Sequence, residues 1–132
     1  MHPFLKSGLA VLLGIVIGGI VNFGIILLSN LIIPPPDGVD VSNIDSIKAN
    51  IHLYTPIHFV FPFLAHALGT FSGAVLAIKI SNQKKVVYLV GLIFLYGGIS
   101  MVNQVPGPLW FSVIDLGIAY IPMAWLATKI KI

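Results

Sequence analysis

Four apolar runs, each about as long as a lipid bilayer is thick, constrain this chain more than any other feature of its sequence. They extend over residues 8–33, 57–80, 86–104 and 109–128. A helix of about 20 apolar residues crosses the ~30 Å hydrocarbon core of a bilayer. The first run is too long for a secretory signal, whose apolar stretch has about 7–15 residues. The sequence therefore predicts an all-α fold, a four-transmembrane-helix bundle in which residues 1–132 form a single membrane domain.

The composition supports a membrane location and excludes several classes of function. Hydrophobic residues make up 58% of the chain and charged residues 8%, whereas soluble domains carry roughly 25% charged residues. Because cysteine is absent, disulfides, thiolate zinc sites and cysteine nucleophiles are excluded. The lysines lie at the ends of the apolar runs and form no basic face, so nucleic acid is not an expected partner. No motif predicts a metal site or a cofactor, and the expected partner is the lipid bilayer.

Prolines mark where the predicted helices end or bend. Pro34–Pro36 follow the first apolar run, and a proline cannot donate a backbone hydrogen bond and disfavours helix in the residue before it. Pro62 lies inside the second run and predicts a kink there. Pro122 lies inside the fourth run, and the sequence VPGP at residues 105–108 predicts a tight turn between the last two spans. The longest connection between spans is the loop of residues 34–56.

The distribution of charge predicts how the helices are oriented. Cytoplasmic loops of membrane proteins carry an excess of lysine and arginine. One side of the predicted bundle has six lysines, which are Lys6, Lys79, Lys84, Lys85, Lys129 and Lys131. The other side has only Lys48, accompanied by Asp37, Asp40 and Asp45. Both termini are therefore expected in the cytoplasm (N-in and C-in), with the loop of residues 34–56 outside.

The external loop carries the pattern of a short helix. In the sequence SNIDSIKANIHLY, Ser42 and Asp45 approximate a capping box. Ile44, Ile47 and Ile51 follow at helical spacing, with polar residues between them. We therefore expect a short amphipathic helix at the outer membrane interface, between the first and second spans. It would serve either as a packing cap on the bundle or as a lid over a central site.

Small residues repeat at four-residue intervals along the first and second spans. In lipid, helices associate through close packing of such residues, because they let two backbones approach. The stripe of the first span ends at Asn22. The residues expected to mediate helix packing are Ala10, Gly14, Gly18, Ala65, Gly69, Gly73 and Ala77. We expect the two stripes to be in close contact, either with each other or across the interface of an oligomer.

Each predicted span contains a polar residue at a similar depth. Asp115 is the only acid within a span, and His66, Asn22 and Tyr96 lie on the other three spans. An ionisable residue inside a membrane is costly, which makes it a candidate for function. One hypothesis is a proton or ligand site made by Asp115 and His66 and lined by Asn22 and Tyr96. The other is that these groups bond one another and fix the helix register without a ligand.

Three stretches, IIPPPDGVD, PFLAHALGT and YIPMAW, resemble those of small four-span integral membrane proteins of bacteria whose function is uncharacterised. The resemblance covers most of the chain. It implies a bundle in the bacterial inner (cytoplasmic) membrane, and it implies no particular activity.

These features lead to one functional hypothesis and two alternatives. The first is binding or transport of a small solute or ion, linked to protons, through the polar layer in the middle-to-outer membrane. The second is a non-catalytic structural or accessory subunit that docks partners through its small-residue stripes. The third, an intramembrane enzyme, is disfavoured because no catalytic constellation is visible beside Asp115. Four short spans enclose little space, so a transport path predicts a homodimer or another membrane subunit.

Overall fold

Helices make up 78% of the chain in the computed structural model, which describes residues 1–131, and no strand occurs among these residues. Four helical segments are long and apolar enough to cross a membrane: Pro3–Ile32, Pro56–Ser81, Val86–Gln104 and Leu109–Ala127. The prediction of an all-α chain with four candidate membrane spans is confirmed at this level. The chain is therefore a membrane protein by its architecture.

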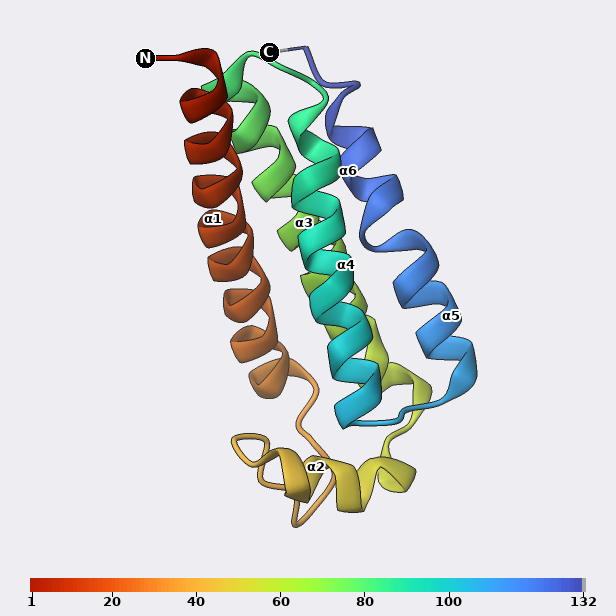
Figure 1. Ribbon diagram of the computed structural model, residues 1–132. Helices are drawn as coiled ribbons and strands as arrows, with labels where there is room; N and C mark the ends of the chain where they lie inside the picture. The colour runs from red at the N-terminus through yellow and green to blue at the C-terminus, as the bar shows by residue number, and fades with distance from the viewer. Residues whose placement is uncertain (132) are drawn as a thin grey trace.

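The central helix of the bundle is α3 (Val60–Ser81), which contacts the helices of all three other spans. It is flanked by α1 (Pro3–Ile32) and by α4 (Val86–Gln104). The fourth span is divided into α5 (Leu109–Ile118) and α6 (Ile121–Ala127). Figure 1 shows both termini at one end of the bundle and the long loop at the other.

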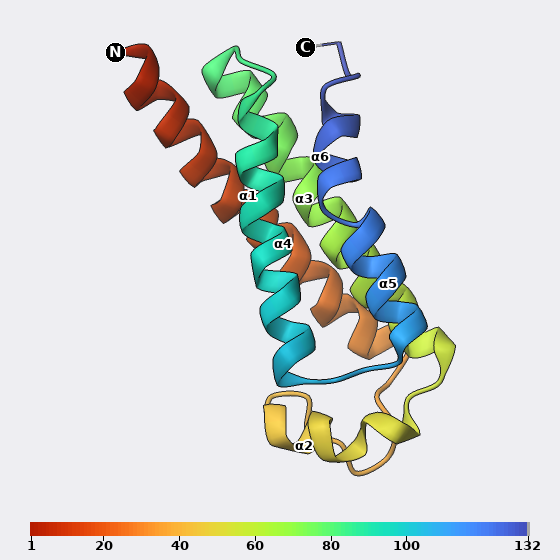
Figure 2. The same cartoon turned by 45° about the vertical axis from the view of Figure 1, so that its right-hand side comes forward.

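The first helix is longer than a bilayer requires, and it lies at an angle to its neighbours. Its 30 residues extend over about 45 Å at 1.5 Å per residue. It begins at Pro3 and not at the predicted residue 8, because the His2 ring accepts a hydrogen bond from the Phe4 N–H at 3.2 Å and proline suits the first helical position. Figure 2 shows α1 inclined across α4. A tilt of this kind fits a long helix into a hydrocarbon core of ~30 Å.

The loop between the first two spans contains three short helical segments. α2 (Ile44–Asn50) and η1 (Ile51–Leu53) lie across the end of the bundle opposite the termini (Figure 1), and none of their residues is buried. η2 (Pro56–Phe59) leads directly into α3. The buried Phe59 ring attaches this segment to the bundle through Phe111, with 4.7 Å between the ring centroids. The placement of α2 at a membrane interface stays a prediction, as does the orientation of the termini.

The cap of α2 differs from the predicted capping box. Asn43, and not Ser42, is the N-cap, and its Oδ1 atom accepts hydrogen bonds from the N–H groups of Asp45 at 2.9 Å and Ser46 at 3.4 Å. Ser42 instead donates its hydroxyl and its N–H to Asp40 Oδ1, at 2.6 and 3.0 Å. These two bonds lower the pKa of the Asp40 carboxyl. Because the Ser42 hydroxyl is bonded within the preceding turn, the next residue caps the helix.

Small side chains fill the centre of the bundle, and large side chains cover its outside. The residues without exposed surface include Ala10, Ala65, Ala74, Ala77, Ala119, Ala124 and Ala127. At least half of the surface is exposed in Leu12, Ile20, Phe23, Leu31 and Leu92. A soluble protein buries its large apolar residues preferentially. Lipid tails solvate such residues as well as a protein core does, so this arrangement fits a chain whose solvent is a bilayer.

Of the two prolines predicted to lie inside the apolar runs, Pro122 interrupts a helix and Pro62 does not. The ring of Pro122 would clash with the carbonyl four residues back, which belongs to Ile118, the last residue of α5. Tyr120, between the two helices, has φ −112° and ψ −81°, outside the helical range. Pro62 lies in the first turn of α3, where a missing N–H breaks no intrahelical bond. The chain changes from 3₁₀ to α-helix at Val60, two residues before Pro62.

Replacing Pro122 by alanine is expected to join α5 and α6 into one continuous helix. The new N–H can donate to the Ile118 carbonyl, and such a bond contributes about 1 kcal/mol. Amide hydrogen exchange over residues 118–122 should then slow by about fivefold. Pro62→Ala is the matched control, since it restores an N–H that has no partner within α3. Unchanged exchange in Pro122→Ala would show that the interruption has another cause.

Candidate functional site

The glycine stripes of α1 and α3 pack against each other within the chain. A Cβ atom added to Gly14 would lie 2.6 Å from the Gly73 carbonyl oxygen, and one added to Gly18 would lie 2.5 Å from the Gly69 carbonyl oxygen. The reverse contacts are similarly tight. Backbones this close can exchange weak Cα–H···O contacts. Of the two arrangements predicted for the stripes, the structure therefore has the contact inside one protomer.

Asn22 continues the α1 stripe and lies beside Gly69, whose added Cβ would be 3.1 Å from Asn22 Cβ. The Asn22 Oδ1 atom is buried and has no hydrogen-bond donor within residues 1–131. Every other buried side-chain oxygen or nitrogen among residues 1–131 has a hydrogen-bond partner. A buried amide oxygen without a donor destabilises a fold. The structure thus places Asn22 in the α1–α3 contact, where it forms no hydrogen bond with His66 or Asp115.

Two of the predicted site residues, His66 and Asp115, are in direct contact. His66 Nδ1 on α3 lies 2.7 Å from Asp115 Oδ1 on α5. The Asp115 side chain is 4% exposed, and the His66 side chain is 24% exposed. The carboxyl group therefore lies inside the bundle, and the imidazole connects it with the accessible surface.

Tyr120 completes this group, although it is not among the residues predicted for the site. Its hydroxyl donates a hydrogen bond to Asp115 Oδ2 at 3.2 Å, and its ring stacks on the His66 imidazole with 5.8 Å between the centroids. The buried ring fits because α4 presents Gly98 to it. A Cβ atom on Gly98 would lie 2.5 Å from the Tyr120 hydroxyl oxygen. We call Asp115, His66 and Tyr120 the acid–imidazole cluster.

The interruption before α6 explains why sequence spacing does not reveal Tyr120. In a continuous helix, residues 115 and 120 would point about 140° apart. The non-helical backbone at Tyr120 allows its hydroxyl to reach Asp115. Pro122 is the one signal of this interruption in the sequence, and it does not indicate which way the following side chains turn.

Tyr96, which was predicted to line the site, faces away from it. Its exposed fraction is 77%. Gly98, two residues further along α4, packs against Tyr120. Residues two positions apart on a helix point about 160° from each other. Tyr96 therefore lies on the opposite side of α4 from the acid–imidazole cluster and does not line it.

The cluster can hold a proton at a defined atom. With Asp115 as a carboxylate, its short contact to His66 favours the tautomer that carries hydrogen on Nδ1. Nε2 is then the atom that gains or loses a proton, and it makes no hydrogen bond within residues 1–131. The Tyr120 hydroxyl stabilises the second carboxylate oxygen. Because an imidazole can both accept and donate a proton, Nε2 is the atom of the cluster at which a proton can be exchanged.

The surroundings of the cluster are apolar. Toward the loop end of the bundle, an apolar cavity of about 210 Å³ lies between η2, α3 and α5, and Phe63 and Ile114 are among its lining residues. Phe63 also packs against the core cluster that contains Tyr120. Within residues 1–131, no group of three or more histidine or acidic side chains is placed to hold a metal ion.

No protein-family model, curated protein or solved structure matches this chain. The functional interpretation of the acid–imidazole cluster therefore rests on its geometry and on the properties of its three side chains.

Proposed function

We propose that this chain is a bacterial inner-membrane protein that binds or moves a small solute or ion with proton linkage, and that the acid–imidazole cluster is its proton-binding centre. The observation that carries the proposal is the contact between a buried Asp115 carboxyl and a partly accessible His66 imidazole. An acid inside a span is costly, and neutral side chains could fix helix register at lower cost. Proton exchange at the cluster would explain why an acid occupies this position in the span.

The interrupted fourth span supports the proposal. In many transporters, substrates and ions bind where a membrane helix is discontinuous, because the interrupted backbone has polar groups to offer. Here the interruption at Ala119 and Tyr120 begins one helical turn after Asp115. The ionisable side chains and the non-helical backbone therefore lie in one small region of the bundle.

The charge of the cluster favours a cation as the solute. When His66 Nε2 is protonated, the imidazolium and the Asp115 carboxylate form a neutral pair. When Nε2 loses its proton, the cluster carries one negative charge, which attracts a cation in a medium of low dielectric constant. A proton and a cation would then compete for the cluster, and such competition is the basis of proton-coupled exchange.

A structural role is the second candidate, and one observation favours it. Both Asp115 oxygens have partners, as expected of a lock that joins α3 to the fourth span. Docking of a partner through the glycine stripes is not favoured, because Gly14 and Gly18 are already covered by α3. A second copy or another subunit would have to use a different face of α1, where an added Cβ at Gly19 or Gly24 meets nothing within 4 Å.

Infrared titration of the protein in lipid bilayers tests the proton-binding centre. The chain has no glutamate, so replacing Asp37, Asp40 and Asp45 by asparagine leaves Asp115 as the only side-chain carboxyl. The carboxylate bands of Asp115 should shift as His66 gains its proton. His66→Gln should abolish the shift, and Asp115→Asn should remove the bands themselves. Bands that stay constant through the titration of His66 would contradict the proposal.

Proton flux distinguishes an exchanger from a structural lock. In liposomes that enclose a pH-sensitive dye, Na⁺ or K⁺ added outside is expected to drive proton movement through the wild type. Asp115→Asn should abolish this movement and leave the melting temperature close to that of the wild type. If neither cation moves protons and Asp115→Asn chiefly lowers the melting temperature, the cluster is a structural lock.

A further inference from the structure

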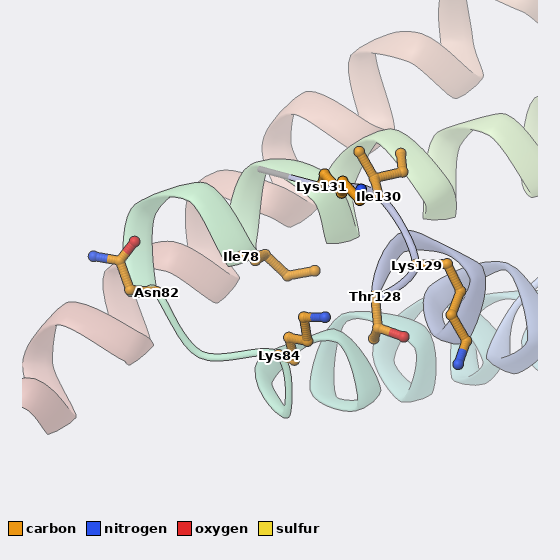
Figure 3. A pocket seen from close by; sticks show the side chains of 7 residues that line it. All are labelled: Ile78, Asn82, Lys84, Thr128, Lys129, Ile130 and Lys131. Atoms are coloured by element: carbon orange, nitrogen blue, oxygen red, sulfur yellow. The ribbon is translucent and has the colours of Figure 1, made fainter.

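A basic pocket lies at the end of the bundle that carries both termini (Figure 3). It has a volume of about 750 Å³ and forms where α3 ends, α4 begins and the chain leaves α6. Its lining residues are Ile78, Asn82, Lys84, Thr128, Lys129, Ile130 and Lys131. Three of these are lysines and two are isoleucines, so the pocket combines positive charge with apolar surface.

No acid of the described chain neutralises the pocket. All four acids in the sequence are aspartates. Asp37, Asp40 and Asp45 belong to the loop at the opposite end of the bundle, and Asp115 is bonded to His66. That bonded pair is the only acid–base contact of ion-pair length within residues 1–131. The pocket therefore has positive charge available for an anionic ligand.

The lysines of the pocket are not equivalent. In Figure 3 the Lys84 amine points in toward the Ile78 side chain, whereas Lys129 points away from it. The Lys129 ammonium lies 4.7 Å from the centre of the Trp125 ring, a cation–π contact that holds it at the rim. Lys84 and Lys131 are thus the lysines of the lining that remain for a ligand.

We propose that this pocket binds the phosphate of an anionic phospholipid headgroup. Lysine ammonium groups would hold the phosphate, and the isoleucines would contact the glycerol and the first acyl carbons. The position favours lipid as the source of the phosphate, because basic pockets between membrane helices at the lysine-rich side bind such headgroups. The neighbouring Trp125, which is 47% exposed, is of the residue type found at the level of the headgroups.

Lysines at this end of the bundle also have a purely electrostatic explanation. The C-terminal ends of α3 and α6 carry partial negative charge, which nearby lysines stabilise without any ligand. On that explanation every lysine at this end contributes through its charge alone. The pocket proposal requires that the lining lysines matter more. Lys79 and Lys85 provide the comparison, since they lie at the same end and do not line the pocket.

The test compares two double variants that remove equal charge, Lys84→Gln with Lys131→Gln and Lys79→Gln with Lys85→Gln. Each full-length protein is purified in neutral detergent and mixed with phosphatidylglycerol, phosphatidylcholine or inorganic phosphate, and the retained ligand is counted by native mass spectrometry. The pocket variant should bind phosphatidylglycerol about 30-fold more weakly than the wild type. The control variant should bind it almost as well as the wild type, and phosphatidylcholine should be retained by neither.

Three results would overturn the proposal. Equal losses in the two double variants would show that the surface field, and not the pocket, attracts the lipid. If phosphatidylcholine were retained as well as phosphatidylglycerol, the pocket would not select lipids by their charge. Inorganic phosphate that binds alone and displaces the lipid would assign the pocket to a soluble phosphate. If circular dichroism shows that the double variant fails to fold, the single variant Lys84→Gln gives the same comparison. Lys84→Arg is then expected to restore binding.

Discussion

Gly73→Leu is expected to separate α1 from α3 and to prevent the bundle from forming. Even a Cβ atom at Gly73 would collide with the Gly14 carbonyl oxygen. A backbone carbonyl cannot move aside as a flexible side chain does, so the loss in free energy of unfolding should exceed the about 1–3 kcal/mol typical of overpacking. Gly19→Leu is the matched control, because nothing lies within 4 Å of a Cβ added there.

The absence of cysteine makes this expectation measurable in membranes. Cysteines introduced at Ala10 and Ala77, which belong to one core cluster of α1 and α3, are the only thiols and should cross-link on oxidation. The cross-link should persist in Gly19→Leu and be lost in Gly73→Leu. Undiminished cross-linking and an unchanged melting temperature in Gly73→Leu would contradict the assigned contact. Cross-links between chains would instead place the stripes at an oligomer interface.

Gly98→Val is expected to disrupt the acid–imidazole cluster without changing any of its residues. Because a Cβ at Gly98 would lie 2.5 Å from the Tyr120 hydroxyl oxygen, the Tyr120 ring has to leave its position. Asp115 then loses one of its two partners, and a buried polar group deprived of a hydrogen bond destabilises a fold by about 1–3 kcal/mol. Gly97→Val is the matched control, since an added Cβ there meets nothing within 4 Å.

A double-mutant cycle with Tyr120→Leu identifies the cause of the loss. Both Gly98→Val and Tyr120→Leu remove the bond between Tyr120 and Asp115, so their effects on the free energy of unfolding should be strongly non-additive. The infrared shift of the Asp115 carboxylate should also change in Gly98→Val and stay the same in Gly97→Val. Additive effects would mean that Gly98 does not act through Tyr120.

The spans of this protein follow from its sequence more directly than their ends do. The thickness of a bilayer makes the length of an apolar run a measure of a span, and α1 ends before Pro34–Pro36 as expected. Its start depends on the His2 cap, which hydropathy does not detect. The cap of α2 depends on a choice between Ser42 and Asn43, which the hydrogen bonds of Asp40 decide.

For the site, depth along a helix is predictable and rotation about the helix is not. His66 and Asp115 lie at similar depth on different spans, and they do meet. Tyr96 has a similar depth but faces outward, because α4 turns its Gly98 side toward the fourth span. Tyr120 reaches the cluster only through an interruption whose direction the sequence does not specify. Periodicity likewise identifies the glycine faces of α1 and α3 but not their partners.

The contact between α1 and α3 joins two spans that are synthesised before α4, α5 and α6. The nearest atoms to a Cβ built on Gly14, Gly69 or Gly73 all belong to these two helices. Only Gly18 also meets a later helix, through the Phe94 ring of α4. This backbone-to-backbone packing can therefore form before α4, α5 and α6 have been synthesised. α4 and the fourth span can then assemble onto helices whose glycine contacts are already made, with the Phe94 ring packing against Gly18.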